Sequence, residues 1–269
     1  MALTIPAHCE LCPRRCGADR RVATGRCGAG NTLRAARAAL HRWEEPCISG
    51  EDPERGSGTV FFCGCTLGCV FCQNASISHG GEGKDITPER LAEIFTELQA
   101  AGAYNINLVT PTQYLPWIME ALSLCGRRLT IPVLYNTGGY ERVETLRQLA
   151  GKVQIYLPDL KYYASELSAR YSAAPDYFAV ASLALREMFR QVGAVRFDEN
   201  GILQGGMVVR HLVLPGAHKD SLRLLDWLAG EFSPGEIRLS LMSQYTPFYK
   251  AKEHKALGRR ISTYEYRKA

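Results

Sequence analysis

The chain has 269 residues, 46% of them hydrophobic, which is enough for one large core with a small appendage. Its formal net charge is only +5 and the basic residues are scattered, so nucleic-acid binding is not indicated. No apolar stretch reaches the length of a membrane span, and we expect no signal peptide. Ten cysteines in such a chain indicate metal or redox use in a reducing compartment, which predicts a cytoplasmic protein.

Four cysteines near the N-terminus have the spacing C-x2-C-x3-C-x10-C; they are Cys9, Cys12, Cys16 and Cys27. Four thiolates can close a metal shell completely, so this site is structural or electron-relaying, and zinc or an auxiliary iron–sulfur cluster both fit. The alternative is a segment whose four cysteines are reduced and bind no metal, but a segment this polar has few apolar residues with which to form a core. We therefore expect an N-terminal metal-binding segment over residues 1–50 and a second domain over residues 51–269.

An apolar, β-branched run at residues 58–62 predicts a buried strand that leads into a loop with the spacing C-x3-C-x2-C. The three cysteines of this loop are Cys65, Cys69 and Cys72. Three thiolates on one loop can hold three irons of a cubic [4Fe–4S] cluster, which leaves the fourth iron open to a small molecule. A structural zinc site fits less well because it usually takes four ligands grouped in two pairs, and disulfides do not suit a chain of this size without a signal peptide.

Strand-like and helical patterns alternate from residue 58 onward, which predicts parallel strands with right-handed crossovers and a partial (β/α)6 barrel. The expected strands are 59–64, 104–110, 131–136, 153–157, 207–214 and 236–242. The expected helices are 87–101, 115–124, 141–149, 177–192 and 221–232. The sequence at 198–201 predicts a hairpin turn before the fifth strand. In such barrels the site lies where strands end, so polar residues at those ends are expected on one rim.

The cysteine loop and its neighbours resemble the radical S-adenosylmethionine (SAM) superfamily. Residues 9–16, 56–78, 210–216 and 241–247 resemble the branch related to pyruvate formate-lyase activating enzymes, often labelled PflX. The resemblance implies that a [4Fe–4S] cluster reductively cleaves SAM, and that the resulting 5′-deoxyadenosyl radical takes a hydrogen atom from a substrate. That substrate is a glycyl residue of a partner enzyme, another peptide or a small molecule, and the reductant is a protein such as flavodoxin or ferredoxin.

The resemblance also implies a SAM site. The superfamily places a residue like Phe71 against the adenine, and Asp159 and Lys161 match an Asp-x-Lys pair of the activating enzymes. Lys161 would pair with the SAM carboxylate, and Asp159 would meet the ribose hydroxyls or a cation. The alternative is that Asp159 and Lys161 form a solvent-exposed ion pair at the end of a strand and have no role in binding SAM. Of Arg210 and His211, which alternate on one strand, we expect Arg210 to face the interior as a fixed cation for the SAM carboxylate or an acidic substrate.

Two segments depart from the family pattern. The activating enzymes carry Asp-Thr-Asn-Gly where this chain has Asn136-Thr137-Gly138-Gly139, so the acid of a cation site is missing, and Asn136 is the residue of this segment expected at the SAM site. A Gly-Gly-Glu motif is replaced by residues 110–113, where the Thr110 or Thr112 hydroxyl would accept from the SAM amino group, or where Pro111 simply sets a turn.

Some cysteines receive no chemical role from the sequence. Cys125 is expected to be a buried small hydrophobe, Cys63 to face away from the cluster, and Cys47 has no assigned role. No catalytic side chain is assigned. The competing function is a non-catalytic iron–sulfur electron carrier or redox sensor, and a further alternative is a zinc-ribbon interaction protein.

Overall fold

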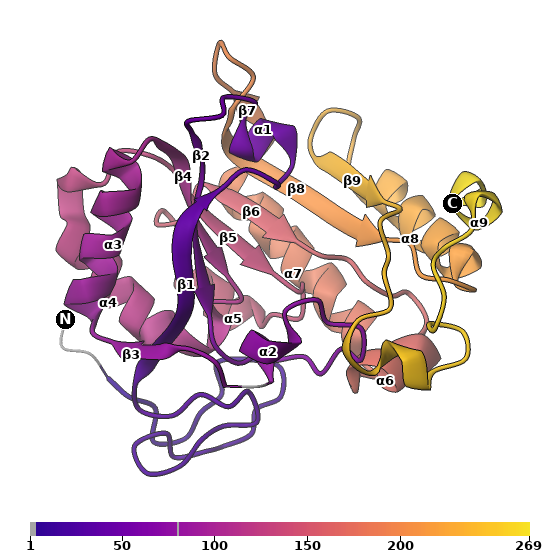
Figure 1. The fold of residues 1–269 in the computed structure, drawn as a ribbon, viewed down its shortest axis with the longest axis horizontal. Helices are drawn as coiled ribbons and strands as arrows, with labels where there is room; N and C mark the ends of the chain where they lie inside the picture. Colours follow the sequence, from indigo (N-terminus) through magenta and orange to yellow (C-terminus); the bar gives the residue numbers. More distant parts are fainter. Residues whose placement is uncertain (1–3, 80) are drawn as a thin grey trace.

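The computed structural model describes residues 4–79 and 81–269, so the first three residues of the expected N-terminal segment lie outside it. Its centre is an open sheet of parallel strands with helices in the connections, which confirms the expected partial (β/α)6 architecture (Figure 1). The parallel strands are β2 (Gly56–Phe62), β4 (Ala103–Val109), β5 (Val133–Thr137), β6 (Ile155–Pro158), β8 (Leu203–Leu212) and β9 (Arg238–Met242).

Helices cover the outer face of the sheet (Figure 1). They are α3 (Pro88–Ala100), α4 (Leu115–Cys125), α5 (Val143–Arg147), α6 (Ser165–Ser172), α7 (Tyr177–Val192) and α8 (His218–Glu231). The first of them shows why these segments are helical: the Thr87 hydroxyl accepts from the Arg90 N–H at 3.2 Å, and Pro88 occupies the first turn. Such a cap stabilises a helix by about 1 kcal/mol. Cys125 is buried on α4, as expected.

An antiparallel edge extends the sheet beyond the predicted strands. β1 (Leu33–His41) pairs with β2, and β3 (Lys84–Ile86) pairs with β1. The sequence of β1 is rich in alanine and arginine rather than β-branched residues, so its pattern does not indicate a strand. Because β1 lies within residues 1–50, that segment shares the sheet of the second expected domain, and the division at residue 50 stays a prediction.

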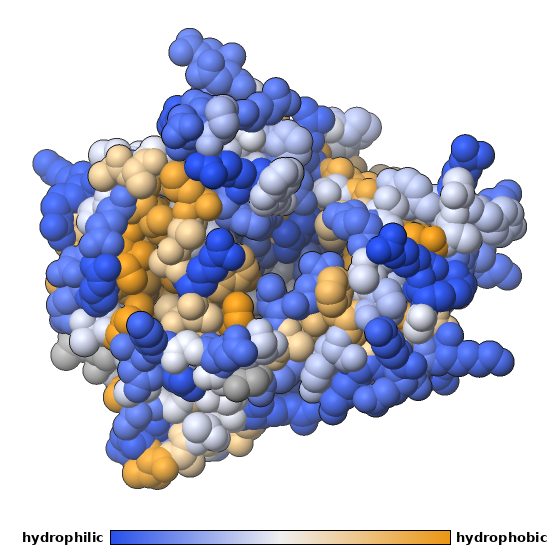
Figure 2. All heavy atoms as spheres, viewed as in Figure 1, coloured by the Kyte–Doolittle hydropathy of each residue, from blue (hydrophilic) through white to orange (hydrophobic). Residues whose placement is uncertain are grey.

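The inner face of the sheet is closed at one end by the short helix α1 (Pro46–Ser49). Asn105 on β4 donates to the Ile48 carbonyl at 2.9 Å, and Ile48 is buried against Leu134 and Val208. Figure 2 shows this face of the molecule hollowed near its centre, with polar residues in the recess. The polar site described below lies at the other end of the inner face, where the parallel strands finish.

The remaining elements are short: α2 (Ala75–Ser78), α9 (Thr263–Lys268), β7 (Arg196–Phe197), and 3-10 turns at Thr112–Tyr114, Gly126–Arg128 and Tyr249–Glu253. β7 pairs antiparallel with β8, which confirms the predicted hairpin. Its turn is held by the Asp198 carboxylate, which accepts from the N–H groups of Asn200 and Ile202 at 2.9 Å. Within residues 4–79 and 81–269, no helix is both long and apolar enough to cross a membrane.

Candidate functional site

The cysteine loop follows β2 directly and is held against the N-terminal segment. The Cys65 N–H donates to the Cys27 carbonyl at 3.2 Å. Gly64 has φ +79°, and a Cβ there would lie 2.2 Å from the same carbonyl oxygen. Glycine is therefore required for the close approach of the two segments. Cys63 points away from the loop, with its sulfur 3.0 Å from the Glu82 carbonyl.

Each thiol of the loop has a polar group beside its sulfur. The Leu67 N–H donates to Cys65 Sγ at 3.4 Å, and the Ser172 hydroxyl donates to Cys69 Sγ at 2.9 Å. Cys72 Sγ lies 3.4 Å from the Ser78 hydroxyl. Burial raises the pKa of the Cys65 and Cys69 thiols, so they need a cation to become thiolates. Three thiols on one loop, of which Cys65 and Cys69 accept hydrogen bonds at sulfur, are a donor set that fits the three ligated irons of a [4Fe–4S] cluster.

A group of charged side chains lies at the carboxyl end of the neighbouring strands. Asp159, just after β6, contacts Lys161 Nζ at 2.6 Å and Arg210 Nε at 2.9 Å. Arg210 also donates to the Asn136 side-chain oxygen at 2.8 Å. The structure therefore brings together four of the residues expected on one rim. His211 faces the other way, between the Leu160 carbonyl and the Ser221 hydroxyl, so Arg210 is the one of the two that faces inward.

These charges stabilise one another in a buried setting. Burial by itself raises the pKa of Asp159, but Arg210 and Lys161 outweigh burial and lower it below the ordinary value. Burial by itself lowers the pKa of Lys161, but the Asp159 carboxylate outweighs burial and raises it. The Lys161 ammonium opposes the burial that raises the pKa of the Cys69 thiol. A Cβ on Gly138 would lie 3.6 Å from Lys161 Cε and 2.8 Å from the Leu67 side chain, so Lys161 lies close to the cysteine loop. The Asp159 and Lys161 side chains are therefore both charged near neutral pH.

Glu44 completes this charged group, and the sequence analysis did not identify it. It lies in the connection between β1 and α1, and its carboxylate contacts Arg210 Nη1 at 3.2 Å. Burial raises the pKa of Glu44 to about 7, although Arg210 opposes that shift. No local motif marks Glu44, because its partner lies 166 residues away in the sequence.

The glycines after β5 allow the strand ends to meet. Gly139 has φ +79°, and a Cβ there would lie 2.2 Å from the Asp159 carbonyl oxygen. A Cβ on Gly138 would lie 2.8 Å from the Leu67 side chain in the cysteine loop. The Tyr177 hydroxyl, 2.8 Å from the Gly138 and Asp159 carbonyls, fixes this junction. The departure from the family's Asp-Thr-Asn-Gly pattern therefore coincides with tight backbone packing.

The other residues expected near SAM make contacts with neighbouring residues of the protein itself. Phe71 is buried, with its ring 6.5 Å from that of Tyr162 and 6.0 Å from that of Tyr245. The Thr112 hydroxyl donates to the Glu141 carboxylate at 2.6 Å. Thr110 has φ +56°, and its carbonyl accepts from Gln113 Nε2 at 2.8 Å. Their roles toward SAM stay predictions.

The four N-terminal cysteines lie on turns packed against this rim. A Cβ on Gly25 would lie 3.4 Å from Cys16 Sγ and 3.5 Å from Cys27 Sγ, so these two sulfurs flank one glycine. The pKa of the Cys12 thiol is raised to about 12, chiefly by burial, with smaller contributions from Cys27 and Cys9. Among the described residues, no three Cys, His, Asp or Glu side chains are arranged to hold a single metal ion. A metal at these cysteines therefore stays a prediction.

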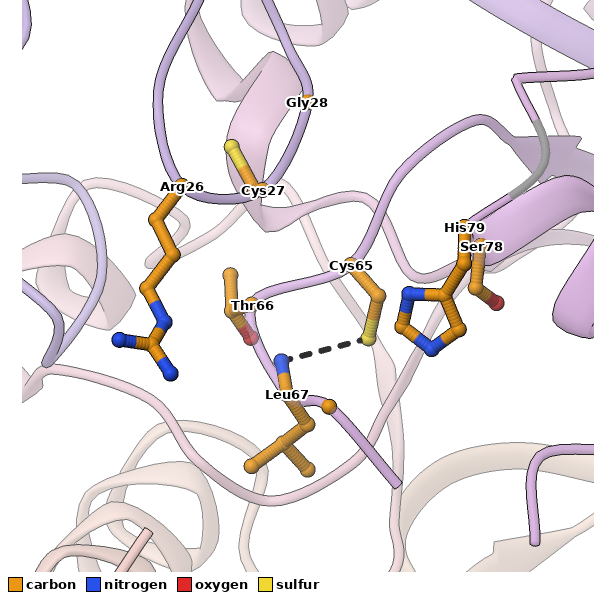
Figure 3. Close-up of a pocket in the computed structure, with 9 residues that line it drawn as sticks. Arg26, Cys27, Gly28, Cys65, Thr66, Leu67, Ser78 and His79 are labelled. Atoms are coloured by element: carbon orange, nitrogen blue, oxygen red, sulfur yellow. Dashed lines mark hydrogen bonds between the residues drawn. The ribbon is translucent and has the colours of Figure 1, made fainter. Parts of the chain in front are cut away.

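A cavity of ≈ 250 Å³ lies between the two cysteine segments (Figure 3). Cys27 and its neighbours line one side, and Cys65 to Gly68 line the other. His79 borders the cavity and stacks on Tyr249, with ring centroids 5.4 Å apart. The cavity is thus lined by one cysteine of each group, Cys27 and Cys65.

Comparisons with known proteins find a family model for the part of the chain that holds the cysteine loop. Residues 59–174 match the Radical SAM superfamily. The chain is 30% identical over 280 residues to the uncharacterized protein MJ0674 of Methanocaldococcus jannaschii, covering 100% of this chain and 75% of that protein.

Two solved structures are more distant. SuiB of Streptococcus suis bound to the precursor peptide SuiA has a TM-score of 0.46 and 16% identity, over 72% of this chain and 42% of that chain. Native anSMEcpe with bound AdoMet has a TM-score of 0.48 and 13% identity, over 76% of this chain and 55% of that chain. The chain thus spans about half the length of these two proteins. Residues 59–174, which include the cysteine loop, match the radical SAM superfamily, and over its full length the chain belongs to the family of MJ0674.

Proposed function

We propose that this protein is a radical SAM enzyme of the branch related to pyruvate formate-lyase activating enzymes. Cys65, Cys69 and Cys72 would hold the [4Fe–4S] cluster, and SAM would bind at the open iron. A bound cluster would supply the one-electron reduction that cleaves SAM, which is the chemistry that hydrogen abstraction from a substrate requires. One observation carries this proposal most directly: the Lys161 side chain, paired with Asp159 at 2.6 Å, lies at the cysteine loop, because a Cβ on Gly138 would be 3.6 Å from Lys161 Cε and 2.8 Å from the Leu67 side chain.

The charged group is suited to binding a zwitterionic ligand. The Lys161 ammonium would pair with the SAM carboxylate, and Asp159 would accept hydrogen bonds from the ribose hydroxyls. Arg210 already contacts Asp159, Asn136 and Glu44, so its role would be to orient Asp159 rather than to bind SAM alone. Phe71 would contribute its backbone to the adenine site, as the family resemblance implies.

The substrate class that we propose is a glycyl residue of a partner enzyme, another peptide or a small molecule. The electron would come from a cytoplasmic protein such as flavodoxin or ferredoxin. The cysteines Cys9, Cys12, Cys16 and Cys27 would hold zinc or an auxiliary iron–sulfur cluster in an N-terminal domain. These assignments draw on the family resemblance and on the donor types present.

The test is anaerobic reconstitution of the full chain with iron and sulfide, followed by reduction with dithionite in the presence of SAM. We expect a brown protein that releases 5′-deoxyadenosine, and we expect Cys65→Ala, Cys69→Ala and Cys72→Ala each to abolish release. Binding of SAM should also shift the EPR signal of the reduced cluster. A fully loaded cluster that SAM neither perturbs nor reacts with would instead indicate an electron carrier or redox sensor.

A further inference from the structure

Cys69 differs from the other two cysteines of the loop in its hydrogen bonding. The hydroxyl of Ser172, the last residue of α6, donates to the Cys69 sulfur over a distance of 2.9 Å. Ser172 is fully buried, with 0% of its surface exposed. Water therefore does not compete for this hydroxyl, and the bond persists in a region of low dielectric constant.

A second hydroxyl fixes the direction of this bond. The Tyr162 hydroxyl lies 2.7 Å from Ser172 Oγ, and Tyr162 is also buried. Because Ser172 directs its single proton to sulfur, its oxygen is left to accept the proton of Tyr162. The result is a chain of two hydroxyls, from Tyr162 through Ser172 to the Cys69 sulfur, in which each bond polarises the next.

The other two cysteines have weaker partners. Cys65 receives a backbone N–H at 3.4 Å. Cys72 lies 3.4 Å from the Ser78 hydroxyl, but Ser78 donates its proton to the Asn74 carbonyl at 2.9 Å. Toward a Cys72 thiolate, which has no proton of its own, Ser78 is therefore not a donor. Ser78 is therefore a matched control for Ser172: it also lies beside a cysteine of the loop, but it does not donate a hydrogen bond to the sulfur.

The position of Ser172 is held from two directions. In the cysteine loop, the Val70 N–H donates to the Tyr171 carbonyl at 2.9 Å. From the N-terminal segment, the Arg14 guanidinium donates to the carbonyls of Ser172 at 3.1 Å and of Thr66 at 2.9 Å. The end of α6 is thus fixed relative to the cysteine loop, which preserves the short contact between hydroxyl and sulfur.

We propose that Ser172, oriented by Tyr162, is a positioning residue that raises the reduction potential of the cluster bound at Cys69. This inference rests on the proposed function, in which Cys69 ligates the [4Fe–4S] cluster. Reduction by an external one-electron donor adds one negative charge to the cluster and breaks no bond. A hydrogen bond to a cluster sulfur stabilises the more negative, reduced state, so the bond makes the cluster easier to reduce.

The experiment is a potentiometric titration of the reconstituted full chain, followed by EPR of the reduced cluster. We expect Ser172→Ala to lower the equilibrium constant for reduction roughly tenfold, which for one electron is a shift of about 59 mV to more negative potential. Tyr162→Phe should shift the potential in the same direction by less. Ser172→Thr, which keeps the hydroxyl, and the matched control Ser78→Ala should retain the wild-type potential.

Two outcomes would overturn the inference: a wild-type potential in fully loaded Ser172→Ala, or an equal shift in Ser78→Ala. If Ser172→Ala fails to load the cluster, the comparison of Tyr162→Phe with wild type decides, and an unshifted potential there counts against the proposal. These results are distinct from failure of the proposed function. A wild-type protein that holds no cluster contradicts the function, whereas an intact cluster that cleaves SAM with an unshifted potential in the variants contradicts only the role of Ser172.

Discussion

The backbone N–H of Cys65 donates to the carbonyl oxygen of Cys27 at 3.2 Å, which joins the four-cysteine segment to the first cysteine of the cluster loop. The two cysteines are far apart in sequence, and a second hydrogen bond, from the Arg14 guanidinium to the Thr66 carbonyl at 2.9 Å, also joins the two segments. The position of each segment therefore depends on the other. The first contact is possible only because Gly64, between them, has no side chain.

Replacing Gly64 should disturb the cluster loop more than replacing another glycine of positive φ that has open space around it. In Gly64→Ala the new Cβ would lie 2.2 Å from the Cys27 carbonyl oxygen, so the two segments would have to move apart. The left-handed conformation of the alanine would cost about 1–2 kcal/mol besides. Gly28→Ala is the matched control, because Gly28 has φ +81° but no atom within 4 Å of its added Cβ. We expect lower iron content and lower Tm for Gly64→Ala. Equal iron content and equal Tm in the two variants would contradict this role of the close contact.

Much of the site's location could be predicted because parallel strands end at one edge of a sheet. Asp159 and Lys161 follow β6, whereas Asn136 and Arg210 lie near the ends of β5 and β8, and the structure gathers all four as that rule requires. Their placement thus followed from strand periodicity. Their roles toward SAM came from the family resemblance alone and stay predictions.

Glu44 and Ser172 could not be predicted, for physical reasons that differ. Glu44 reaches Arg210 from a connection after β1, a strand whose alanines and arginines carry no strand pattern. Ser172 ends α6, a helix of eight residues with few apolar positions, so its periodicity is too weak to detect. In both cases the important contact joins segments distant in sequence, and a single Glu or Ser carries no motif.

Stability should depend on pH through Glu141. Burial raises the pKa of Glu141 to about 7, against hydrogen bonds from Thr112 and Thr137 that lower it. An acid whose pKa is higher in the folded than in the unfolded chain favours folding while it is protonated, and this contribution is lost as pH rises through about 7. In Glu141→Gln, a neutral amide replaces the carboxylate and does not titrate.

We therefore expect the Tm of Glu141→Gln, relative to that of wild type, to increase between pH 5 and pH 8. Thermal unfolding of the reconstituted proteins across that range measures the difference. Glu199→Gln, on an exposed hairpin turn, controls for the loss of one carboxylate. A constant Tm difference for Glu141→Gln across the range would mean that this carboxylate is ionised throughout.

Lys161 provides a direct test of the SAM site. If its ammonium holds the SAM carboxylate, Lys161→Ala should weaken SAM binding by about 1.5–3 kcal/mol, the usual contribution of a hydrogen bond to a charged group. Lys161→Arg should not fully restore binding, because a planar guanidinium does not fit the place of a compact ammonium. Calorimetric titration of SAM into reconstituted variants measures the affinity, with exposed Lys152→Ala as control. Wild-type affinity in Lys161→Ala would leave the Asp159–Lys161 pair with a structural role only.

The four N-terminal cysteines should bind metal independently of the cluster loop. Cys9, Cys12, Cys16 and Cys27 can supply a complete shell of four thiolates, whereas the cluster at Cys65–Cys72 needs the three cysteines of its own loop. We expect the triple Cys65/Cys69/Cys72→Ala variant to retain metal, and elemental analysis identifies it: zinc indicates a structural site, and iron with sulfide indicates an auxiliary cluster. Adding Cys12→Ala to the triple variant should remove that metal. A triple variant purified without any metal would contradict a four-thiolate site.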